Sequence, residues 1–244
     1  MIHLFAQLTS ECEFTPLSKA YSNGHTEQQT KTMGSPMSEL NQHWNQIFDN
    51  KQGDELGWFE DDISQTLKFV DQMSLSAPSR IFIPGAGTSQ LVDKLYADCH
   101  QLLLNDLSDS ALAQLKERLI QDHDRENNAE YLVQDISQPL NIEADSIDAW
   151  IDRAVFHFLL NENAIQGYFN NLKSAVKKGG YVLLAEFSKQ GDKKCAGLGV
   201  HQYDLEEMQQ RLGSGFQLIA AEEFESINPF GDSRPYIYGL FKRQ

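Results

Sequence analysis

From residue 80 onward, short apolar runs alternate with segments of helical periodicity, and this alternation limits the fold more than any other feature of the sequence. It is typical of βαβ units, in which parallel strands form a sheet that helices cover. We expect strands near residues 80–84, 101–105, 130–134, 147–152, 180–187, 216–224 and 235–242. We expect helices near residues 88–97, 109–120, 162–177 and 203–212.

The last two expected strands are separated by a short segment that contains Asn228, Pro229, Gly231 and Asp232, all of them residue types favoured in turns. A short connection joins antiparallel strands, whereas parallel strands need a long crossover. The sequence therefore predicts an α/β fold of the Rossmann-like type. It has seven strands, mostly parallel, with an antiparallel C-terminal hairpin and helices on both faces.

Residues 1–36 are polar and show no sustained helical or strand period. We expect them to form a weakly ordered N-terminal leader, followed by one domain over residues 37–244. Before the first strand, two helical patterns supply apolar faces. Their apolar residues are Leu40, Trp44, Ile47 and Phe48, then Ile63, Leu67 and Val70. These helices can cover one edge of the sheet or close over a ligand.

Composition narrows the class of partner. The chain has 244 residues, of which 41% are hydrophobic, and this is enough for one buried core. Its formal net charge of −15 disfavours nucleic acid as a partner, because binding to phosphates depends on Lys and Arg. No apolar run is long enough to span a membrane, and the cysteines lack the spacing of a zinc site. We expect a cytoplasmic protein without a bound metal, and nothing in the sequence indicates an oligomeric state.

A glycine-containing turn follows the first expected strand and leads into a helix. Its residues are Pro84, Gly85, Ala86, Gly87 and Thr88. Glycines let the backbone approach a ligand closely, and the free N–H groups at the start of the helix suit a nucleoside-containing cofactor. A purely structural turn is the alternative. Gln90 stands where the third glycine of GxGxxG would fall, which argues against a typical dinucleotide site.

Two acidic residues close expected strands. Asp106, followed by Leu107, lies about 20 residues after the glycines, a spacing at which a carboxylate accepts hydrogen bonds from ribose hydroxyls. Asp135 ends the third strand, where it can accept a hydrogen bond from an exocyclic amine, and Ile136 can pack on adenine. Helix capping is the alternative for Asp106, and a surface loop is the alternative for Asp135.

The fourth expected strand leads into a cluster of charged and aromatic residues, DAWIDRAVFHFL, at positions 148–159. Ligands of open α/β sheets bind at this edge, so Asp152 and Arg153 are candidates for cofactor binding. His157 is a candidate for the same region. An ion pair that stiffens the loop is the alternative for Asp152 and Arg153, and a packed core histidine is the alternative for His157.

Taken in order, these segments resemble the class I methyltransferases that depend on S-adenosylmethionine. They are most similar to a bacterial branch with the pattern PGxGTSxLVDxL, DxSxxAL, DxWxDRAVFHFL, a strand led by two glycines, and CxGLxVxxY. The matching stretches are residues 84–95, 106–112, 148–159, 179–187 and 195–203. The resemblance implies a seven-stranded methyltransferase sheet, S-adenosylmethionine as cofactor and S-adenosylhomocysteine as product.

The resemblance also implies roles for single residues. Gly85 and Gly87 would hold the methionine and ribose part of the cofactor, Asp106 the ribose hydroxyls, and Asp135 would lie near adenine. Trp58 is similar to the first residue of a WY or WF pair that closes over the cofactor. Two departures from the pattern are Ala86 in place of cysteine, which is harmless to cofactor binding, and Gln202 in place of arginine, which bears on acceptor preference.

Methyl transfer from a sulfonium needs orientation and desolvation, with a base only when the acceptor arrives protonated. We expect Asp152 and His157 to shape the acceptor pocket, and further candidates are Glu186, His201 and Tyr203. The expected acceptor is the nitrogen, sulfur or oxygen atom of a small molecule. A lysine of a partner protein stays open, since the chain is distantly similar to eukaryotic protein-lysine methyltransferases. A non-catalytic protein that binds S-adenosylmethionine or a nucleotide is the second alternative.

Overall fold

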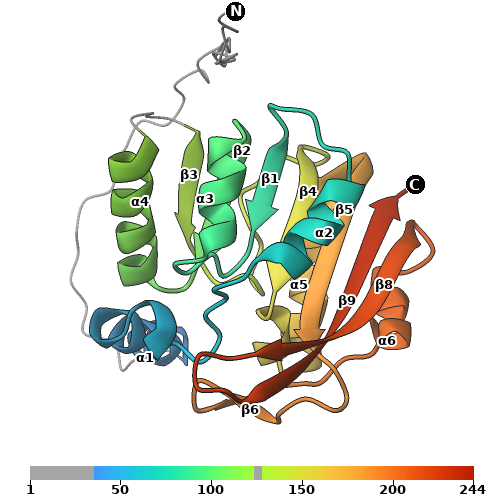
Figure 1. Ribbon diagram of the computed structural model, residues 1–244. Coiled ribbons are helices and arrows are strands. Elements are labelled where there is room, and N and C mark those ends of the chain that lie inside the picture. The colour runs from blue at the N-terminus through green and yellow to red at the C-terminus, as the bar shows by residue number, and fades with distance from the viewer. Residues whose placement is uncertain (1–35, 124–127) are drawn as a thin grey trace, which may run out of the picture. The chain divides into compact units, whose positions relative to one another are not determined.

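The computed structural model describes residues 36–123 and 128–244, and the expected leader lies outside the described residues except for Pro36. A seven-stranded sheet has the order β3-β2-β1-β4-β5-β9-β8 (Figure 1). Its strands are β1 (Arg80–Ile83), β2 (Gln101–Asp106), β3 (Ala129–Val133), β4 (Ile147–Arg153), β5 (Val176–Phe187), β8 (Phe216–Ile227) and β9 (Ser233–Arg243). Strands β1 to β5 are parallel, and β9 is antiparallel to both β5 and β8. The predicted mostly parallel sheet with an antiparallel C-terminal hairpin is confirmed.

Helices cover both faces of this sheet, as predicted. Helices α2, α3 and α4 lie in front of the sheet in Figure 1, and α5 and α6 lie behind it. The helices are α1 (Pro36–Asn50), α2 (Ser64–Gln72), α3 (Gln90–Ala97), α4 (Asp109–His123), α5 (Glu162–Ala175) and α6 (Leu205–Leu212). Smaller elements are the 3₁₀ turns η1 (Gly53–Glu55) and η2 (Phe156–Phe158) and the ribbon of β6 (Lys194–Cys195) and β7 (Leu198–Gly199). None of the described helices is long and apolar enough to cross a membrane.

The central strands are buried on both faces, because successive side chains of a strand point to opposite sides. Ile81 and Ile83 of β1 pack into the core under α2, α3 and α4, while Phe82 packs into the core under α5 and α6. Phe82 stacks on Trp150 of β4 with ring centroids 4.1 Å apart. These short strands therefore read as unbroken apolar runs in the sequence.

Strand β5 begins earlier than expected, and its glycines lie inside it. The pairing with β4 shifts between Ile147 opposite Val176 and Ala149 opposite Tyr181. Gly179, at φ +78°, lies in this irregular stretch, where a residue without Cβ tolerates the left-handed conformation. The two glycines that lead this strand in the sequence pattern therefore lie within it, where its pairing with β4 is irregular.

Helix α1 lies at the carboxyl ends of the parallel strands (Figure 1). It is held there by side-chain hydrogen bonds rather than by the sheet itself. Asn41 donates to the carbonyl of Leu107, Asn45 donates to Asp109 at 2.6 Å, and Gln114 donates to the carbonyl of Phe48 at 2.8 Å. The chain winds in opposite directions on either side of β1 and β4, and ligands of such sheets bind beside that switch point. Helix α1 thus covers the place where a ligand is expected.

Candidate functional site

A cavity of about 870 Å³, the main cavity, opens at the carboxyl ends of the parallel strands and lies within the size range of small-molecule sites. Two groups of residues line it. The glycine side consists of residues 84–89, 105–107 and 134–138. The aromatic side consists of Trp44, Trp58, Phe158, Leu159 and Leu198.

The turn after β1 brings backbone close to the loop after β4. Gly85 and Gly87 have φ values of +52° and +50°. A Cβ placed on Gly85 would lie 2.3 Å from Cγ2 of Val155, so no other residue fits without displacing the loop. Ser89 then accepts a hydrogen bond from the N–H of Leu91 and caps α3. The bare backbone of this turn forms part of the cavity wall.

Asp106 ends β2 beside this turn and is only 8% exposed. One carboxylate oxygen accepts the N–H of Gly87 at 2.9 Å, and the other accepts the N–H of Ser108 at 2.8 Å. Each oxygen keeps a second lone pair for a ligand. Burial raises the pKa of Asp106 to about 6, against the opposing effect of these backbone donors. Ser108, not Asp106, caps α4, because its hydroxyl accepts the N–H of Ala111 at 3.0 Å.

The loop after β3 places Asp135 and Ile136 in the cavity wall. The Asp135 carboxylate accepts the N–H of Ser137 at 2.8 Å. Helix α5 supports this loop from behind, since Asn171 donates to the carbonyls of Ile136 at 2.7 Å and Gln138 at 2.8 Å. A Cβ on Gly167, one turn earlier, would lie 2.0 Å from the carbonyl oxygen of Ser137. The sequence analysis missed this support, although a glycine four residues before an asparagine within an amphipathic helix is a visible signal.

Arg153 lines the cavity between the two sides and pairs with Glu60, not with Asp152. Its Nε lies 3.1 Å from a Glu60 carboxylate oxygen, and both side chains are largely buried. It also donates to the carbonyl of Trp58 at 3.3 Å and lies 4.8 Å from the ring centre of Tyr236. Burial raises the pKa of Glu60, and the Arg153 charge opposes that shift. The pair ties the segment before α2 to the end of β4.

The aromatic side is assembled from segments that lie far apart in the sequence. The ring centroid of Trp44 on α1 lies 5.6 Å from that of Trp58 and 5.2 Å from that of Phe158, both in edge-to-face contact. His43 of α1 lies within hydrogen-bond distance, 3.0 Å, of the carbonyl of Ala196 in the β6–β7 turn. Helix α1 and the β6–β7 ribbon therefore close over this part of the cavity together.

Several proteins of known structure share this fold. Residues 83–184 match the family model described as a methyltransferase domain, and no curated protein matches the chain. A SAM-dependent methyltransferase structure from Anabaena variabilis has a TM-score of 0.64 at 16% identity, over 88% of this chain and 98% of that chain. For the 1,6-didemethyltoxoflavin-N1-methyltransferase of Burkholderia thailandensis the values are 0.63, 13%, 88% and 93%. For a SAM-dependent methyltransferase from Methanosarcina mazei they are 0.61, 14%, 71% and 96%.

The matched residues 83–184 run from the end of β1 into β5 and include the glycine turn, Asp106 and Asp135. The chain shares its fold with these SAM-dependent methyltransferases, and one stretch of it is similar to a methyltransferase domain. The glycine turn and Asp106 suit a nucleoside-containing cofactor such as S-adenosylmethionine, because they combine a close backbone approach with unused acceptor positions on a carboxylate.

The structure brings together nearly all residues that the sequence analysis assigned to cofactor binding. Those that line the main cavity are Trp58, Pro84, Gly85, Ala86, Gly87, Thr88, Asp106, Leu107, Asp135, Ile136 and Arg153. Asp152 does not line it. Gln202 does not line it either, because its amide donates to the carbonyl of Gly191 on the outer part of the molecule.

Asp152 and His157 do not line the main cavity, contrary to the expectation that they shape an acceptor pocket. Both are fully buried behind the cavity wall. Asp152 accepts the N–H of Val155 at 3.0 Å and the hydroxyl of Tyr168 at 2.6 Å, while Nδ1 of His157 lies 3.0 Å from a Glu186 carboxylate oxygen. Burial lowers the pKa of His157 to about 3. A general base must reach the proton that it removes, so these residues act by supporting the loop after β4.

The three further candidates named near the predicted mouth also lie away from the cavity. Glu186 and Tyr203 are fully buried, and neither they nor His201 line the cavity. His201 lies 2.8 Å from a Glu207 carboxylate oxygen at the start of α6. Of the charged residues at the end of β4, Arg153 lines the main cavity, whereas Asp152 points into the core.

Proposed function

We propose that the protein is an S-adenosylmethionine-dependent methyltransferase, and that it transfers a methyl group to a small-molecule acceptor held on the aromatic side of the main cavity. One observation carries this proposal: a single cavity contains the glycine turn with Asp106 on one side and an aromatic wall on the other. Burial of most of a ligand's surface in such a cavity, with a few fixed polar groups, is typical of small-molecule recognition.

On the glycine side, we assign the backbone of Gly85 and Gly87 to the methionine and ribose part of the cofactor. The Asp106 carboxylate would accept hydrogen bonds from the ribose hydroxyls. Asp135 would accept the exocyclic amine of adenine, and Ile136 would pack on the adenine ring. Arg153 lines the main cavity between its two sides, next to Trp58 of the aromatic side.

On the aromatic side, the chain offers orientation and water exclusion rather than a free base. Glu60 is paired with Arg153, and burial raises the pKa of the Cys195 thiol to about 11, so this thiol is neutral near pH 7. S-adenosylmethionine supplies a methyl group already activated as part of a sulfonium. The site therefore favours an acceptor that presents a lone pair at neutral pH, such as an aromatic amine nitrogen.

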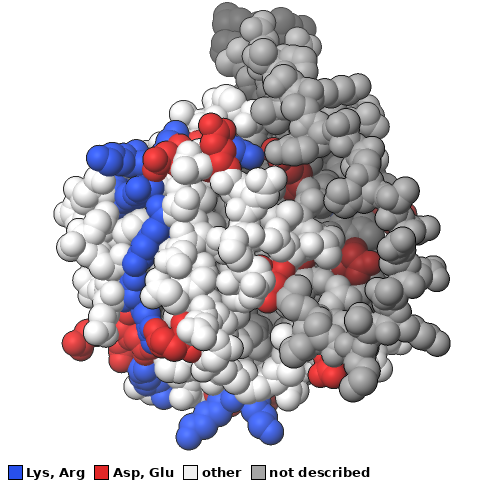
Figure 2. Space-filling model, turned by 180° about the vertical axis from the view of Figure 1, so that it is seen from behind, with Lys and Arg blue, Asp and Glu red and all other residues white. Residues whose placement is uncertain are grey.

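Two observations favour a small molecule over a macromolecular acceptor. A lysine ammonium would need an uncompensated acidic group, whereas Glu60 is already neutralised by Arg153. On the face of the molecule in Figure 2, basic side chains form a narrow band with acidic side chains beside its ends. Among the described residues visible there, the basic side chains do not merge into the broad basic surface that a phosphate backbone favours. The B. thailandensis structure contains a bound small molecule, 1,6-didemethyltoxoflavin, together with S-adenosylhomocysteine.

The first test is calorimetric titration of the full chain with S-adenosylmethionine and S-adenosylhomocysteine, beside Asp106→Ala. We expect micromolar-range binding that is lost in the variant. The acceptor class is then tested with S-adenosylmethionine carrying a labelled methyl group, incubated with a cell extract separated into protein and low-molecular-weight fractions. Label in the small molecules supports the proposal, whereas label on protein lysines would replace it with protein-lysine methylation. Cofactor binding without label in either fraction would indicate a non-catalytic protein.

A further inference from the structure

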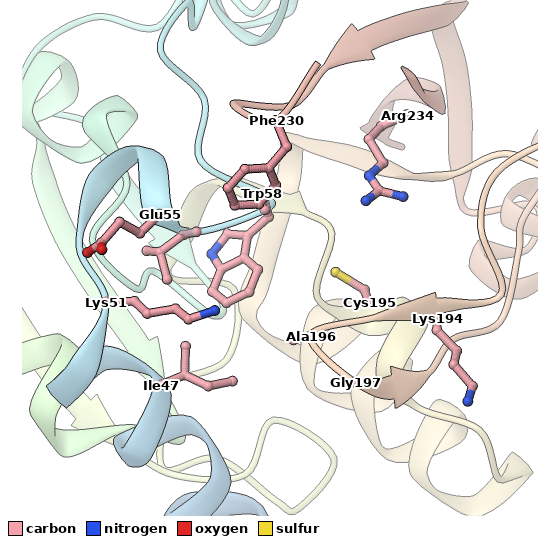
Figure 3. A pocket seen from close by; sticks show the side chains of 12 residues that line it. Ile47, Lys51, Glu55, Trp58, Lys194, Cys195, Ala196, Gly197, Phe230 and Arg234 are labelled. Atoms are coloured by element: carbon pink, nitrogen blue, oxygen red, sulfur yellow. The ribbon is translucent and has the colours of Figure 1, made fainter. Parts of the chain in front are cut away.

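A second, smaller cavity of about 320 Å³ lies beside the main cavity, and we call it the side cavity (Figure 3). It is bordered by the end of α1, by η1, by the β6–β7 ribbon and by the connection between β8 and β9. Leu56, Trp58 and Cys195 line both cavities. These three side chains are therefore the partition between the two spaces, and a molecule on the aromatic side lies next to the side cavity.

The side cavity is basic. Its charged lining residues are Lys51, Glu55, Lys194 and Arg234. In Figure 3 the Lys51 ammonium extends toward Trp58 and the Arg234 guanidinium points toward Cys195, while the Glu55 carboxylate lies on the far side of its segment and Lys194 extends away. Glu55 is engaged there, because it accepts the N–H of Gln52 at 3.1 Å.

The two inward-facing cations have different partners. Lys51 has no ion pair with any described residue. Arg234 pairs with Asp192 and lies 3.7 Å from Asp232, two carboxylates that are 49% and 63% exposed. Exposed ion pairs contribute little free energy, so a ligand oxyanion competes with them at small cost. The main cavity shows no such surplus of positive charge on its aromatic side, where Arg153 is compensated by Glu60.

We propose that the side cavity binds an oxyanion, a carboxylate or a phosphate group, of the methyl acceptor, with Lys51 and Arg234 as its counter-charges. The inference rests on the proposed function and narrows it to anionic small molecules. Guanidinium groups bind carboxylate and phosphate through paired N–H donors, and an ammonium adds a compact positive charge. The acceptor then spans the partition, with its anionic group in the side cavity and its reacting atom on the aromatic side.

Two aromatic side chains beside the side cavity, Trp58 and Phe230, can hold a flat apolar body. Trp58 faces both cavities. Phe230, which is 63% exposed, lies over the side cavity near Trp58 in Figure 3, and its ring is 3.5 Å from the Cβ position of Gly57. An exposed aromatic ring beside a basic cavity can cover an aromatic ligand while its anionic group contacts Lys51 and Arg234.

The test uses the full chain saturated with S-adenosylhomocysteine and a panel of aminobenzoates, hydroxybenzoates and phenyl phosphate. Each compound is paired with its neutral amide or phenol, and binding is measured by ligand-observed NMR titration. Variants Lys51→Met and Arg234→Met remove one charge each and keep an apolar stem. Lys193→Met is the matched control, because Lys193 lies next to Lys194 and does not line either cavity.

We expect anionic members of the panel to bind about tenfold or more tightly than their neutral partners, since charge-assisted hydrogen bonds are about twice as strong as neutral ones. Lys51→Met and Arg234→Met should each remove most of that preference, Lys51→Arg should keep it, and Lys193→Met should not change it. Equal binding of anionic and neutral compounds, equal binding in all variants, or no binding by any panel member would overturn the inference. Calorimetry with S-adenosylhomocysteine on each variant separates this failure from failure of the cofactor site.

Discussion

The glycine side and the aromatic side of the main cavity are built in different ways. Asp106 is the last residue of β2 and Asp135 lies two positions after β3, so strand and site residue are neighbours in sequence. The aromatic side joins α1, the segment at Trp58, η2 and the β6–β7 ribbon, and no strand end fixes their spacing. A rigid cofactor site beside a wall assembled from distant segments lets one sheet serve many acceptors.

The sharpest way to break this comparison is Gly85→Ala. The new Cβ would meet Val155 at 2.3 Å and leave a non-glycine residue at φ +52°. We expect a loss of stability of about 2–5 kcal/mol from strain and overpacking together, and cofactor binding below detection by calorimetry. Gly179→Ala is the matched control, because it has φ +78° with no atom within 4 Å of the Cβ position. It should cost about 1–2 kcal/mol in chemical denaturation and leave cofactor affinity unchanged.

If Gly85→Ala bound S-adenosylhomocysteine with normal affinity, the glycine side would not be the rigid half of the site. An equal loss of affinity in Gly179→Ala would show that global stability, and not the local backbone, controls binding.

The same contrast explains how much could be predicted from the sequence. The periodicity of the strands predicted the sheet. Gly85, Asp106 and Asp135 lie at or near the ends of strands, and they were expected to lie close together because parallel strands end at one edge of the sheet. Burial direction was not predictable at Asp152 and His157. A residue at a strand end points either toward a ligand or into the core, and that choice depends on α5 and on β5, which pack there from elsewhere in the chain.

The aromatic side shows the second limit of prediction from sequence. The spacing of Trp44 and Phe48 correctly predicted an amphipathic helix ahead of the sheet. Its position over the cavity depends on hydrogen bonds from Asn41 and Asn45 to residues after β2, more than 60 positions away. Such pairs leave no periodic signal in a single sequence.

The next largest effect concerns the charge of Asp106. Its pKa of about 6 implies that ionisation, and hence acceptance of ribose hydroxyls, is lost below that pH. We expect affinity for S-adenosylhomocysteine to fall about tenfold between pH 7 and pH 5, as the ionised fraction falls. Calorimetry at both pH values should show this fall in the wild type and in Asp135→Asn. The fall should be absent in Asp106→Asn, whose affinity is low at both.

The stability of the protein should respond to Asp106 with the opposite sign. The pKa in the folded state lies above the ordinary value of an aspartate, 3.8, so the folded state binds the proton more strongly between about pH 4 and pH 6. The contribution of Asp106 to stability therefore decreases as pH rises through that window. If the affinity for the cofactor did not change with pH, a group other than Asp106 would bind the ribose hydroxyls.

A smaller effect is expected for Trp44→Ala on the aromatic side. The variant removes edge-to-face contacts to Trp58 and Phe158 and opens the acceptor wall. Once an acceptor is identified, its KM should rise about tenfold, in line with truncation of a buried aromatic contact, while S-adenosylhomocysteine affinity changes by less than about threefold. Trp44→Phe should restore most of the loss. Equal losses for acceptor and cofactor would show that α1 serves both sides, and the division of the cavity would fail.

The smallest effect on activity is expected for Asp152→Asn, although the motif around Asp152 is the most distinctive of the chain. Burial, together with the charge of Glu186, raises the pKa of Asp152, so an amide of the same shape replaces a carboxyl that already disfavours its charged form. We expect kcat to change by less than about threefold, the range of a supporting residue that does not touch the reacting atoms. Asp152→Ala, which removes the acceptor for Val155 and Tyr168, should instead cost about 1–3 kcal/mol of stability.

The melting temperature of Asp152→Asn as a function of pH gives a second test, because a side chain that only packs would not change that pH dependence. The folded state holds the Asp152 proton more strongly than the unfolded state does, so the wild type loses stability as pH rises above the ordinary pKa of an aspartate. The variant has no such group, so its melting temperature relative to that of the wild type should increase as pH rises. A folded Asp152→Asn protein whose kcat fell 100-fold would contradict the supporting role of Asp152. The acceptor would then reach Asp152, and the main cavity would have to extend past its wall into the core.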